Sequence, residues 1–434
     1  MSTSSRPTTV TSTPTAETIR SDRPHQTSDT ASAAETARVA ATVLAPAIGA
    51  GLISRRPAVL QFLERFDVDR KAIRTLRALR REHSGRPVRL RLPGRSVTVL
   101  LDHTDVGHLL AGAPTPFSPA TLEKRAALSR FQPHGVLISE RGEREQRRAL
   151  NESALEPGHA LHHLAGHWVR PIDSHAAELP HTIDWTSFSD VWWRIVREVA
   201  LGGDTAADRE ITDLLGELRQ SANWAYLLPA PRRRRQRFLD LVRQQVGLNR
   251  PNSLASALGA AASAGSADSA EADPADAADQ VPHWLFAFDA AAIATFRALA
   301  LVVTDPDVHD RARREAADAE SGAPHQLPLL RACVLESLRL WPTTPMLLRE
   351  ARAGTEWGRD GAAFLTFTPL FHRDSARLPY ADRFEPDIWL DGRAEQQPAL
   401  VPFSGGPAAC PGRDVVLFTT ATLLAAILRR RTRR

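Results

Sequence analysis

The chain has 434 residues, of which 43% are hydrophobic and 24% are charged. These proportions exclude a wholly disordered or fibrous chain, and the length is sufficient for a large enzyme domain with a sizeable core. The only cysteines are Cys333 and Cys410, which excludes a disulfide framework and fits the reducing cytoplasm. We therefore expect a cytoplasmic protein.

The net charge of +5 is concentrated in two arginine runs, at residues 232–235 and 429–434. Outside these runs the chain is mildly acidic. It contains no recognition motif for nucleic acid, so we expect no nucleic-acid partner.

The N-terminal 35 residues are rich in Ser, Thr, Ala and Pro, so residues 1–35 are predicted to be a disordered tail. Residues 36–434 are predicted to form a single domain. The apolar stretch at residues 39–53 is too short for a membrane span and is interrupted by Pro46. It is interpreted as a docked helix, with shallow contact to a membrane surface as the alternative.

The rest of the chain alternates between helical and strand-like patterns. Two short apolar runs, at residues 88–92 and 96–101, flank Pro93-Gly94 and predict a β-hairpin. Residues 257–279 are rich in Ala, Ser, Gly and Asp and predict a loop. Helices are predicted at residues 60–82, 104–110, 140–164, 284–303, 328–340 and 412–428, and a short strand at residues 364–368. The predicted fold is mostly α with a minor β-sheet region.

One segment, Phe403-Ser-Gly-Gly-Pro-Ala-Ala-Cys410-Pro-Gly412, combines three glycines and two prolines around a cysteine. An apolar helix is predicted immediately after it. The N-terminus of a helix lowers the pKa of a nearby thiol, so Cys410 is a candidate thiolate ligand. The alternative is an inert cysteine in a glycine-rich turn.

This segment resembles the cysteine loop of the cytochrome P-450 family of haem-thiolate monooxygenases. The fixed positions of that loop, Phe-x-x-Gly-x-x-x-Cys-x-Gly, are occupied by Phe403, Gly406, Cys410 and Gly412. The resemblance implies the family's triangular, mostly α fold. It also implies haem b (iron protoporphyrin IX) as the cofactor, with Cys410 as the axial ligand of the iron.

Glu336 and Arg339 resemble the family's Glu-x-x-Arg pair, a structural lock behind the haem. The third member of that lock is usually an arginine, and Ile388 stands at its place. The lock is therefore altered, or it is completed by another residue such as Arg393.

Residues 291–295, Ala-Ala-Ile-Ala-Thr, resemble the oxygen-binding motif of the family's central helix. The resemblance implies catalytic positions at Ala291, Ala294 and Thr295, with the Thr295 hydroxyl assisting proton delivery. Ala294 stands where the family has an acid. The Thr295 hydroxyl can bond the carbonyl four residues before it and open the helix locally. A distal pocket is expected over the middle of this helix, walled by Phe288, Ala291 and Ala292. The alternative is that Thr295 is simply packed in an apolar helix.

Arg144 and Arg148 resemble the family's haem-propionate motif, and Arg349 resembles a further propionate-binding arginine. A register shifted by one residue would use Arg147 instead. The other alternative is that these arginines form a solvent-exposed helix face and bind no propionate. Family members from bacteria often carry His two residues before the cysteine, where this chain has Ala408.

Four histidines at helical spacing, His159, His162, His163 and His167, admit a zinc site as an alternative to a solvated helix, although no acidic partner stands at the required interval.

The resemblance implies a monooxygenase that inserts one atom of O2 into a small apolar organic substrate, by hydroxylation or epoxidation, in secondary metabolism. The implied redox partners are ferredoxin and ferredoxin reductase, and a monomer without a membrane span is expected. The alternatives are a peroxygenase or a rearrangement enzyme without redox partners, and a haem-binding sensor.

Overall fold

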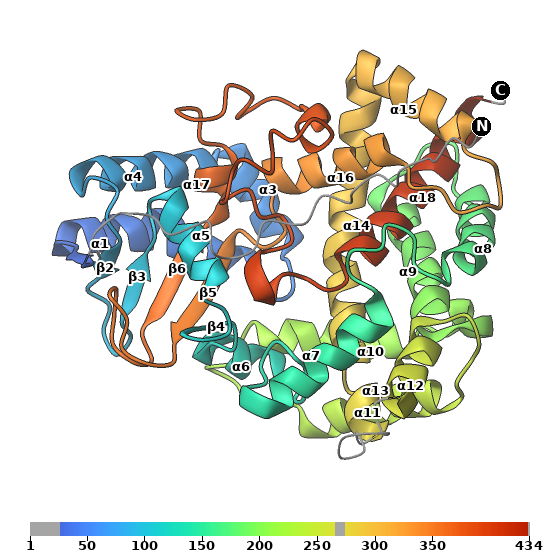
Figure 1. The fold of residues 1–434 in the computed structure, drawn as a ribbon, viewed down its shortest axis with the longest axis horizontal. Coiled ribbons are helices and arrows are strands. Elements are labelled where there is room, and N and C mark those ends of the chain that lie inside the picture. The colour runs from blue at the N-terminus through green and yellow to red at the C-terminus, as the bar shows by residue number, and fades with distance from the viewer. Residues whose placement is uncertain (1–26, 265–273, 433–434) are drawn as a thin grey trace, which may run out of the picture.

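A computed structural model of the protein describes residues 27–264 and 274–432. A small sheet lies at one side of the molecule and most helices lie at the other (Figure 1). The α-helices are α1 (Ala33–Val39), α2 (Ala45–Ala50), α3 (Pro57–Arg65), α4 (Val68–Glu82), α5 (His103–Ala111), α6 (Leu122–Leu128), α7 (Arg141–Leu155), α8 (Ala165–Ala177), α9 (Trp185–Leu201), α10 (Glu210–Ala222), α11 (Arg232–Gly247), α12 (Leu254–Ala264), α13 (Pro274–Ala278), α14 (Val281–Thr304), α15 (Pro306–Asp318), α16 (Pro328–Leu340), α17 (Thr368–His372) and α18 (Arg413–Thr432). A π-helical turn, η2 (Ala40–Leu44), joins α1 to α2, and 3₁₀ turns form η3 (Gly203–Ala207), η5 (Pro386–Trp389) and η6 (Gly406–Ala408).

The sheet has the strand order β1-β2-β3-β6-β5-β4. The strands are β1 (Asp29–Thr30), β2 (Val88–Leu90), β3 (Val97–Val99), β4 (Phe117–Ser118), β5 (Met346–Ala351) and β6 (Ala363–Phe367). Strands β2 and β3 form the predicted hairpin, with Val88 opposite Val99, and β3 continues parallel to β6, with Val99 opposite Leu365. The sheet therefore joins the N-terminal and C-terminal parts of the chain.

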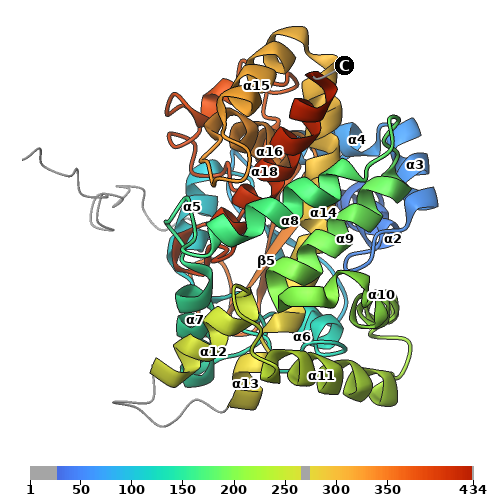
Figure 2. The same cartoon turned by 90° about the vertical axis from the view of Figure 1, so that its right-hand side faces the viewer.

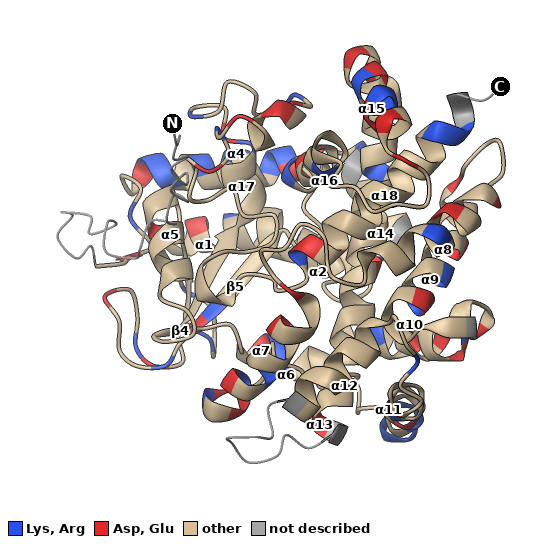
Figure 3. Ribbon diagram, turned by 45° about the vertical axis from the view of Figure 1, so that its right-hand side comes forward, with Lys and Arg blue, Asp and Glu red and all other residues tan. Residues whose placement is uncertain are grey.

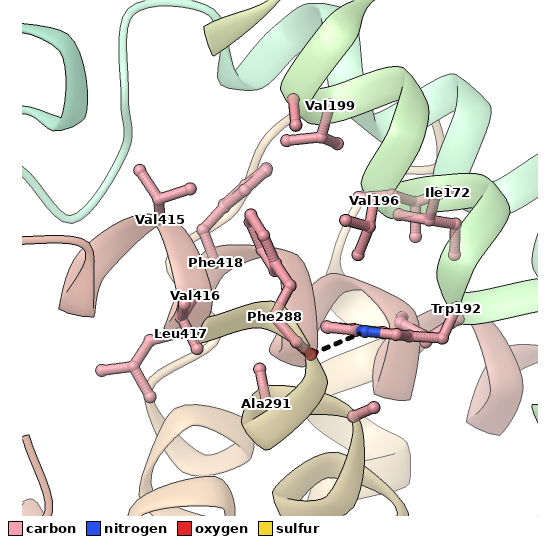
Figure 4. Close-up of a cluster of buried hydrophobic side chains, with 14 of the residues drawn as sticks. Ile172, Trp192, Val196, Val199, Phe288, Ala291, Val415, Val416, Leu417 and Phe418 are labelled. Carbon is pink, nitrogen blue, oxygen red and sulfur yellow. Dashed lines mark hydrogen bonds between the residues drawn. The ribbon is translucent and has the colours of Figure 1, made fainter. Parts of the chain in front are cut away.

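The long helix α14 is the centre of the helical part of the molecule. It contacts α9, α15, α16 and α18, and Figure 2 shows α8 and α9 crossing it. In Figure 4 the side chains of Val415, Val416 and Phe418 from α18 meet Phe288 of α14. The indole N–H of Trp192 on α9 donates a hydrogen bond of 2.9 Å to the Phe288 carbonyl. Apolar burial of this kind fixes α14 against α18, the helix that follows the cysteine loop.

Most predicted elements are present, with four differences. The helix predicted at residues 60–82 is interrupted between α3 and α4, and the helix predicted at residues 140–164 ends at Leu155. Residues 1–26 of the predicted tail lie outside the described residues, but residues 29–39 form β1 and α1 because Ser32 caps α1 through a capping box with Glu35. The predicted loop at residues 257–279 is wrong for its described ends, which form parts of α12 and α13. Alanine favours helix, and buried Leu254 and Leu258 hold α12 in place.

Charged residues gather on outer helices such as α4, α11 and α15 (Figure 3). Within the described ranges one stretch, Asp276–Thr304, is long and apolar enough to cross a membrane. It contains α14, which is surrounded by other helices of the same domain.

The partly buried His83, which follows α4, connects this helix to the N-terminal segment. The ring of His83 lies 2.9 Å from a carboxylate oxygen of Asp29 and 2.9 Å from one of Glu35. Burial opposes protonation of His83, but the hydrogen bonds to Asp29 and Glu35 outweigh it and raise the pKa of His83. The Ser32 backbone and side chain, followed by His83, lower the pKa of Glu35 to about 2.

We expect the contacts of His83 with Asp29 and Glu35 to stabilise the protein less as the pH rises. Because the folded state raises the pKa of His83, its contribution is complete below the ordinary value of about 6.5 and is lost as the pH rises through the folded value. A partly exposed ion pair contributes about 0.2–1 kcal/mol. The urea-unfolding free energy of His83→Gln should therefore fall below wild type by about this amount at pH 6 and by less at pH 9. His159→Gln, at an exposed position, is the control, and an equal deficit at both pH values would contradict the assignment.

Candidate haem-thiolate site

The Cys410 loop lies directly before α18 and is held by its own backbone. The Cys410 N–H donates a hydrogen bond of 3.0 Å to the Phe403 carbonyl. Gly406 has φ +63°, and a Cβ at this residue would lie 2.1 Å from the Leu110 carbonyl oxygen. The loop therefore packs against α5 as only glycine permits.

The pKa of the Cys410 thiol is raised, so the expectation that the helix N-terminus lowers it is wrong for this structure: burial is the largest effect. The Gly412 N–H and the Arg148 guanidinium oppose this effect. Arg148 also donates a 2.7 Å hydrogen bond to the Ala409 carbonyl, next to the cysteine. A thiolate at this position consequently needs a further positive charge, which a bound metal ion would supply.

Two of the predicted propionate arginines are buried without a carboxylate partner. Arg144 donates to the Val136 carbonyl at 2.8 Å and Arg349 donates to the Ser404 hydroxyl at 2.9 Å. Among the described residues no ion pair is formed by either, and the Nε of Arg349 is buried without any hydrogen-bond partner. Burial and the charge of Arg144 lower the pKa of Arg349 to about 10. This is the electrostatic pattern of an anion-binding site.

The other arginines of α7 are already paired. Arg147 faces α13, where it binds Asp276 at 2.8 Å, so the alternative register that uses Arg147 does not match the structure. Arg148 forms an ion pair with Glu152 at 2.6 Å in addition to its contact with the cysteine loop.

The motif on α14 is buried near the middle of that helix. The Thr295 hydroxyl donates a 2.7 Å hydrogen bond to the Ala291 carbonyl, the local arrangement predicted for this residue. The Ala294 carbonyl accepts a 2.9 Å hydrogen bond from Ser337 on α16. Asp289 binds Arg219 on α10 instead of Thr295, so the described residues provide no carboxylate partner for the Thr295 hydroxyl.

Two neighbours of this motif belong to the core. Phe288 packs between Trp192 and α18, and the Ala291 side chain lies in the same cluster (Figure 4). The expectation that Phe288 walls the distal pocket is therefore not met in this structure.

The Glu336–Arg339 pair is fully buried on α16. Arg339 donates two hydrogen bonds to the Glu336 carboxylate, at 2.6 and 2.8 Å. It also donates to four carbonyls, those of His372, Tyr380, Ala381 and Arg383.

Trp389 completes this lock. Its indole N–H donates a 2.9 Å hydrogen bond to the Glu336 carboxylate, and the Glu385 backbone N–H donates another at 2.9 Å. Arg393 instead binds Asp391 and Glu385 near the surface, so the suggested role of Arg393 is wrong. An indole N–H satisfies the buried carboxylate in place of the missing arginine.

The histidine-rich segment is explained by packing. Glu156, His162 and His163 place potential ligand atoms within 4.8 Å of one another. The Nε2 of His162 lies 3.0 Å from the Ala154 carbonyl oxygen, and its Nδ1 accepts a hydrogen bond from the Leu164 N–H. With both ring nitrogens in use, His162 has no lone pair left for zinc.

Comparisons with known proteins agree with this geometry. The family model described as Cytochrome P450 matches residues 233–431. A probable cytochrome P450 4s3 of Drosophila melanogaster is 33% identical over 146 residues, covering 32% of this chain and 30% of the relative. The cyclooctat-9-en-7-ol 5-monooxygenase of Streptomyces melanosporofaciens is 32% identical over 142 residues, covering 30% and 31%. A solved cytochrome P450 structure superimposes with a TM-score of 0.67 at 18% identity, covering 82% of this chain and 87% of that one.

Residues 233–431 match the cytochrome P450 family, and the chain has the fold of that family. It spans about 30% of the length of the curated relatives that it matches. The cofactor of this family is haem b, whose iron is held by a cysteine thiolate. The cytochrome P450 fold is confirmed as predicted.

The residues around Cys410 fit this cofactor. The thiol can ligate the iron, and the ferric charge meets the requirement that burial imposes on a thiolate. The buried guanidinium groups of Arg144 and Arg349, which lack acidic partners among the described residues, can bind the two propionates. Gly406 permits the close approach of the loop to its neighbours.

Sequence reasoning missed two residues of the candidate site. Trp389 was not considered because an indole does not resemble the arginine that it replaces. Lys124 on α6 was not considered either, although it is one of only two lysines in a chain that otherwise uses arginine. Lys124 donates a 3.1 Å hydrogen bond to the carbonyl of Leu348, the residue before Arg349. Burial, followed by the charges of Arg349 and Arg144, lowers the pKa of Lys124 well below its usual value.

We expect Trp389→Phe to destabilise the protein. The substitution retains the aromatic ring but removes the only side-chain donor, other than Arg339, that the described part of the chain offers to the buried Glu336. Loss of one hydrogen bond to a buried charge costs about 1–3 kcal/mol. The free energy of unfolding in urea measures this loss. Arg393→Ala, which breaks partly exposed ion pairs and a cation–π contact with Tyr380, should cost less than about 1 kcal/mol, and the reverse order of the two variants would contradict our assignment of the lock.

Proposed function

We propose that this chain is a haem-thiolate monooxygenase that inserts one atom of O2 into an apolar organic substrate. The observation that carries the proposal is the Cys410 loop itself: the cysteine is partly buried just before α18, Arg148 binds the carbonyl beside it, and Arg349 binds Ser404 of the same loop. The match to the family supports it, as does a relative named as a cyclooctat-9-en-7-ol 5-monooxygenase.

The bound haem would supply oxygen activation, and the chain would supply the ligand, the charges and the proton route. Cys410 would donate electron density to the iron. Arg144 and Arg349 would hold the propionates. Thr295 would hold a proton on its hydroxyl, with its hydrogen bond to the Ala291 carbonyl as the resting position.

Substrate selection is proposed to lie in the loops at residues 114–135 and 224–238. Arg130 fixes these loops to each other: it donates to the Ser221 hydroxyl at 2.7 Å and to the Ala225 and Pro229 carbonyls at 3.0 and 3.1 Å. Arg130 is 3% exposed, so this clamp is part of the interior. A change at one loop would therefore move the other.

Electrons are proposed to come from ferredoxin and ferredoxin reductase. The chain has only one cysteine besides Cys410, which is too few for an iron–sulfur cluster of its own. That residue, Cys333, is fully buried, and burial raises the pKa of its thiol. Two unpaired cysteines also support a cytoplasmic location.

A second candidate function is oxidation with hydrogen peroxide. Ala294 replaces the acid of the family motif, and Asp289 is bound to Arg219. Peroxide already carries the electrons and protons that O2 requires, so a peroxygenase would not need the missing carboxylate.

We expect Thr295→Ala to uncouple reductant consumption from product formation. Loss of a proton-delivering group typically costs about 10²–10⁴-fold in the assisted step, so the product formed per NADH consumed should fall sharply while NADH oxidation continues. The measurement is the ratio of product to NADH with a ferredoxin and its reductase. Thr304→Ala is the matched control, because Thr304 makes the same backbone contact at the exposed end of α14.

The same assay separates the two candidates. A monooxygenase incorporates ¹⁸O from ¹⁸O2 and depends on Thr295. Turnover with hydrogen peroxide alone that equals or exceeds the ferredoxin-driven rate, and that survives Thr295→Ala, would contradict the O2-dependent assignment and favour the peroxygenase.

A further inference from the structure

Two buried arginines and the partly buried Lys124 come together from separate elements, and one of them, Arg349, binds Ser404 of the cysteine loop. Arg144 comes from α7, Arg349 from β5 and Lys124 from α6. Lys124 donates only to backbone carbonyls, those of Pro119 at 3.0 Å and Leu348 at 3.1 Å. Within the described ranges none of the three forms an ion pair with a carboxylate. Unpaired cations in the interior are costly, which indicates that an anion completes the cluster.

The nearby acids cannot be that anion because other groups saturate them. Glu350 is 3% exposed and binds Arg95, Arg125 and Arg352. Glu123, next to Lys124 in the chain, is held by Arg95 at 2.8 Å. These ion pairs leave the Lys124 ammonium without an acidic partner on its own helix.

A porphyrin carries two propionates, and Lys124 adds a third cation to Arg144 and Arg349. Unlike arginine, lysine can release its proton when the anion is absent.

We propose that Lys124 binds a porphyrin propionate together with Arg144 and Arg349, and that its amine takes up a proton from water when the propionate arrives. This inference rests on the proposed haem cofactor. It assigns Lys124 a place in cofactor retention.

A dependence on pH follows, and its sign is fixed by the surrounding groups. Arg349 and Arg144 face Lys124 and favour the neutral amine, while Glu123 favours the ammonium. His283 of α14 also faces Lys124, but burial, together with the charge of Lys124, lowers the pKa of His283 to about 4 and keeps it neutral. A bound propionate raises the pKa of Lys124, so haem retention should weaken as the pH rises through the value of the loaded protein.

The test is the rate of haem transfer from the purified holoprotein to excess apomyoglobin between pH 7 and 10. Removing one charge-assisted hydrogen bond corresponds to about a 10- to 100-fold change, so Lys124→Met should lose haem faster than wild type by about this factor at pH 7. The difference should shrink as the pH rises. Lys71→Met is the matched control, because Lys71 is the other lysine of the chain and is exposed.

Lys124→Arg keeps the charge at every pH of this range. It should retain haem as well as wild type at pH 7 and show a flatter dependence on pH. This comparison tests the proposal even if Lys124→Met does not fold. Equal transfer rates in Lys124→Met and Lys71→Met, or the same pH profile in Lys124→Arg and wild type, would overturn the role of Lys124.

The outcome separates this inference from the proposed function. If the holoprotein shows a thiolate-ligated spectrum and the Lys124 variants behave as wild type, only the inference about Lys124 fails. If the purified protein takes up no haem, the proposed function fails first.

Discussion

The site depends on how a buried sulfur atom can carry a negative charge. Burial raises the pKa of Cys410, and the Gly412 N–H and Arg148 offset only part of this effect. The iron of a bound haem would provide the missing positive charge, and its propionates would pair with the buried guanidinium groups of Arg144 and Arg349. The charges of the cofactor would therefore compensate those of the protein. Without the cofactor, the thiolate and the buried arginines would lack groups of opposite charge.

The scaffold holds this arrangement from behind. The guanidinium group of Arg339 donates hydrogen bonds to Glu336 and to four carbonyls of residues 372–383, the segment that precedes the cysteine loop. The indole N–H of Trp389 donates a further hydrogen bond to the Glu336 carboxylate. Because neither side chain of the Glu336–Arg339 pair is exposed to solvent, dissolved salt screens their attraction little. The pair therefore holds this segment firmly in place. Helix α18 then carries the loop into the core against α14.

Much of this could be predicted from the sequence. The hairpin followed from Pro93-Gly94 between two apolar runs, and the central helix followed from its length and continuous hydrophobicity. The Cys410 loop was identified because its spacing of Phe, Gly and Cys is specific. Local patterns with few alternatives were thus sufficient for most of the fold and for the position of the ligand.

The partners of buried polar groups were not predictable in the same way. Trp389 lies 53 residues from its partner Glu336, and Lys124 lies 225 residues from Arg349, the cation near it; only folding brings each pair together. Phe288 was expected to line the pocket because its helix does, but the side chain points toward Trp192 and α18. The face that a helical residue presents depends on neighbours that the sequence does not list in spatial order.

The most direct test of the account is the absorption spectrum of the reduced protein with carbon monoxide. With Cys410 as the iron ligand, wild type and Cys333→Ser should both show the long-wavelength Soret band of thiolate-ligated haem, and Cys410→Ser should lose it. Absence of that band in wild type, or its survival in Cys410→Ser, would contradict the assignment of the ligand.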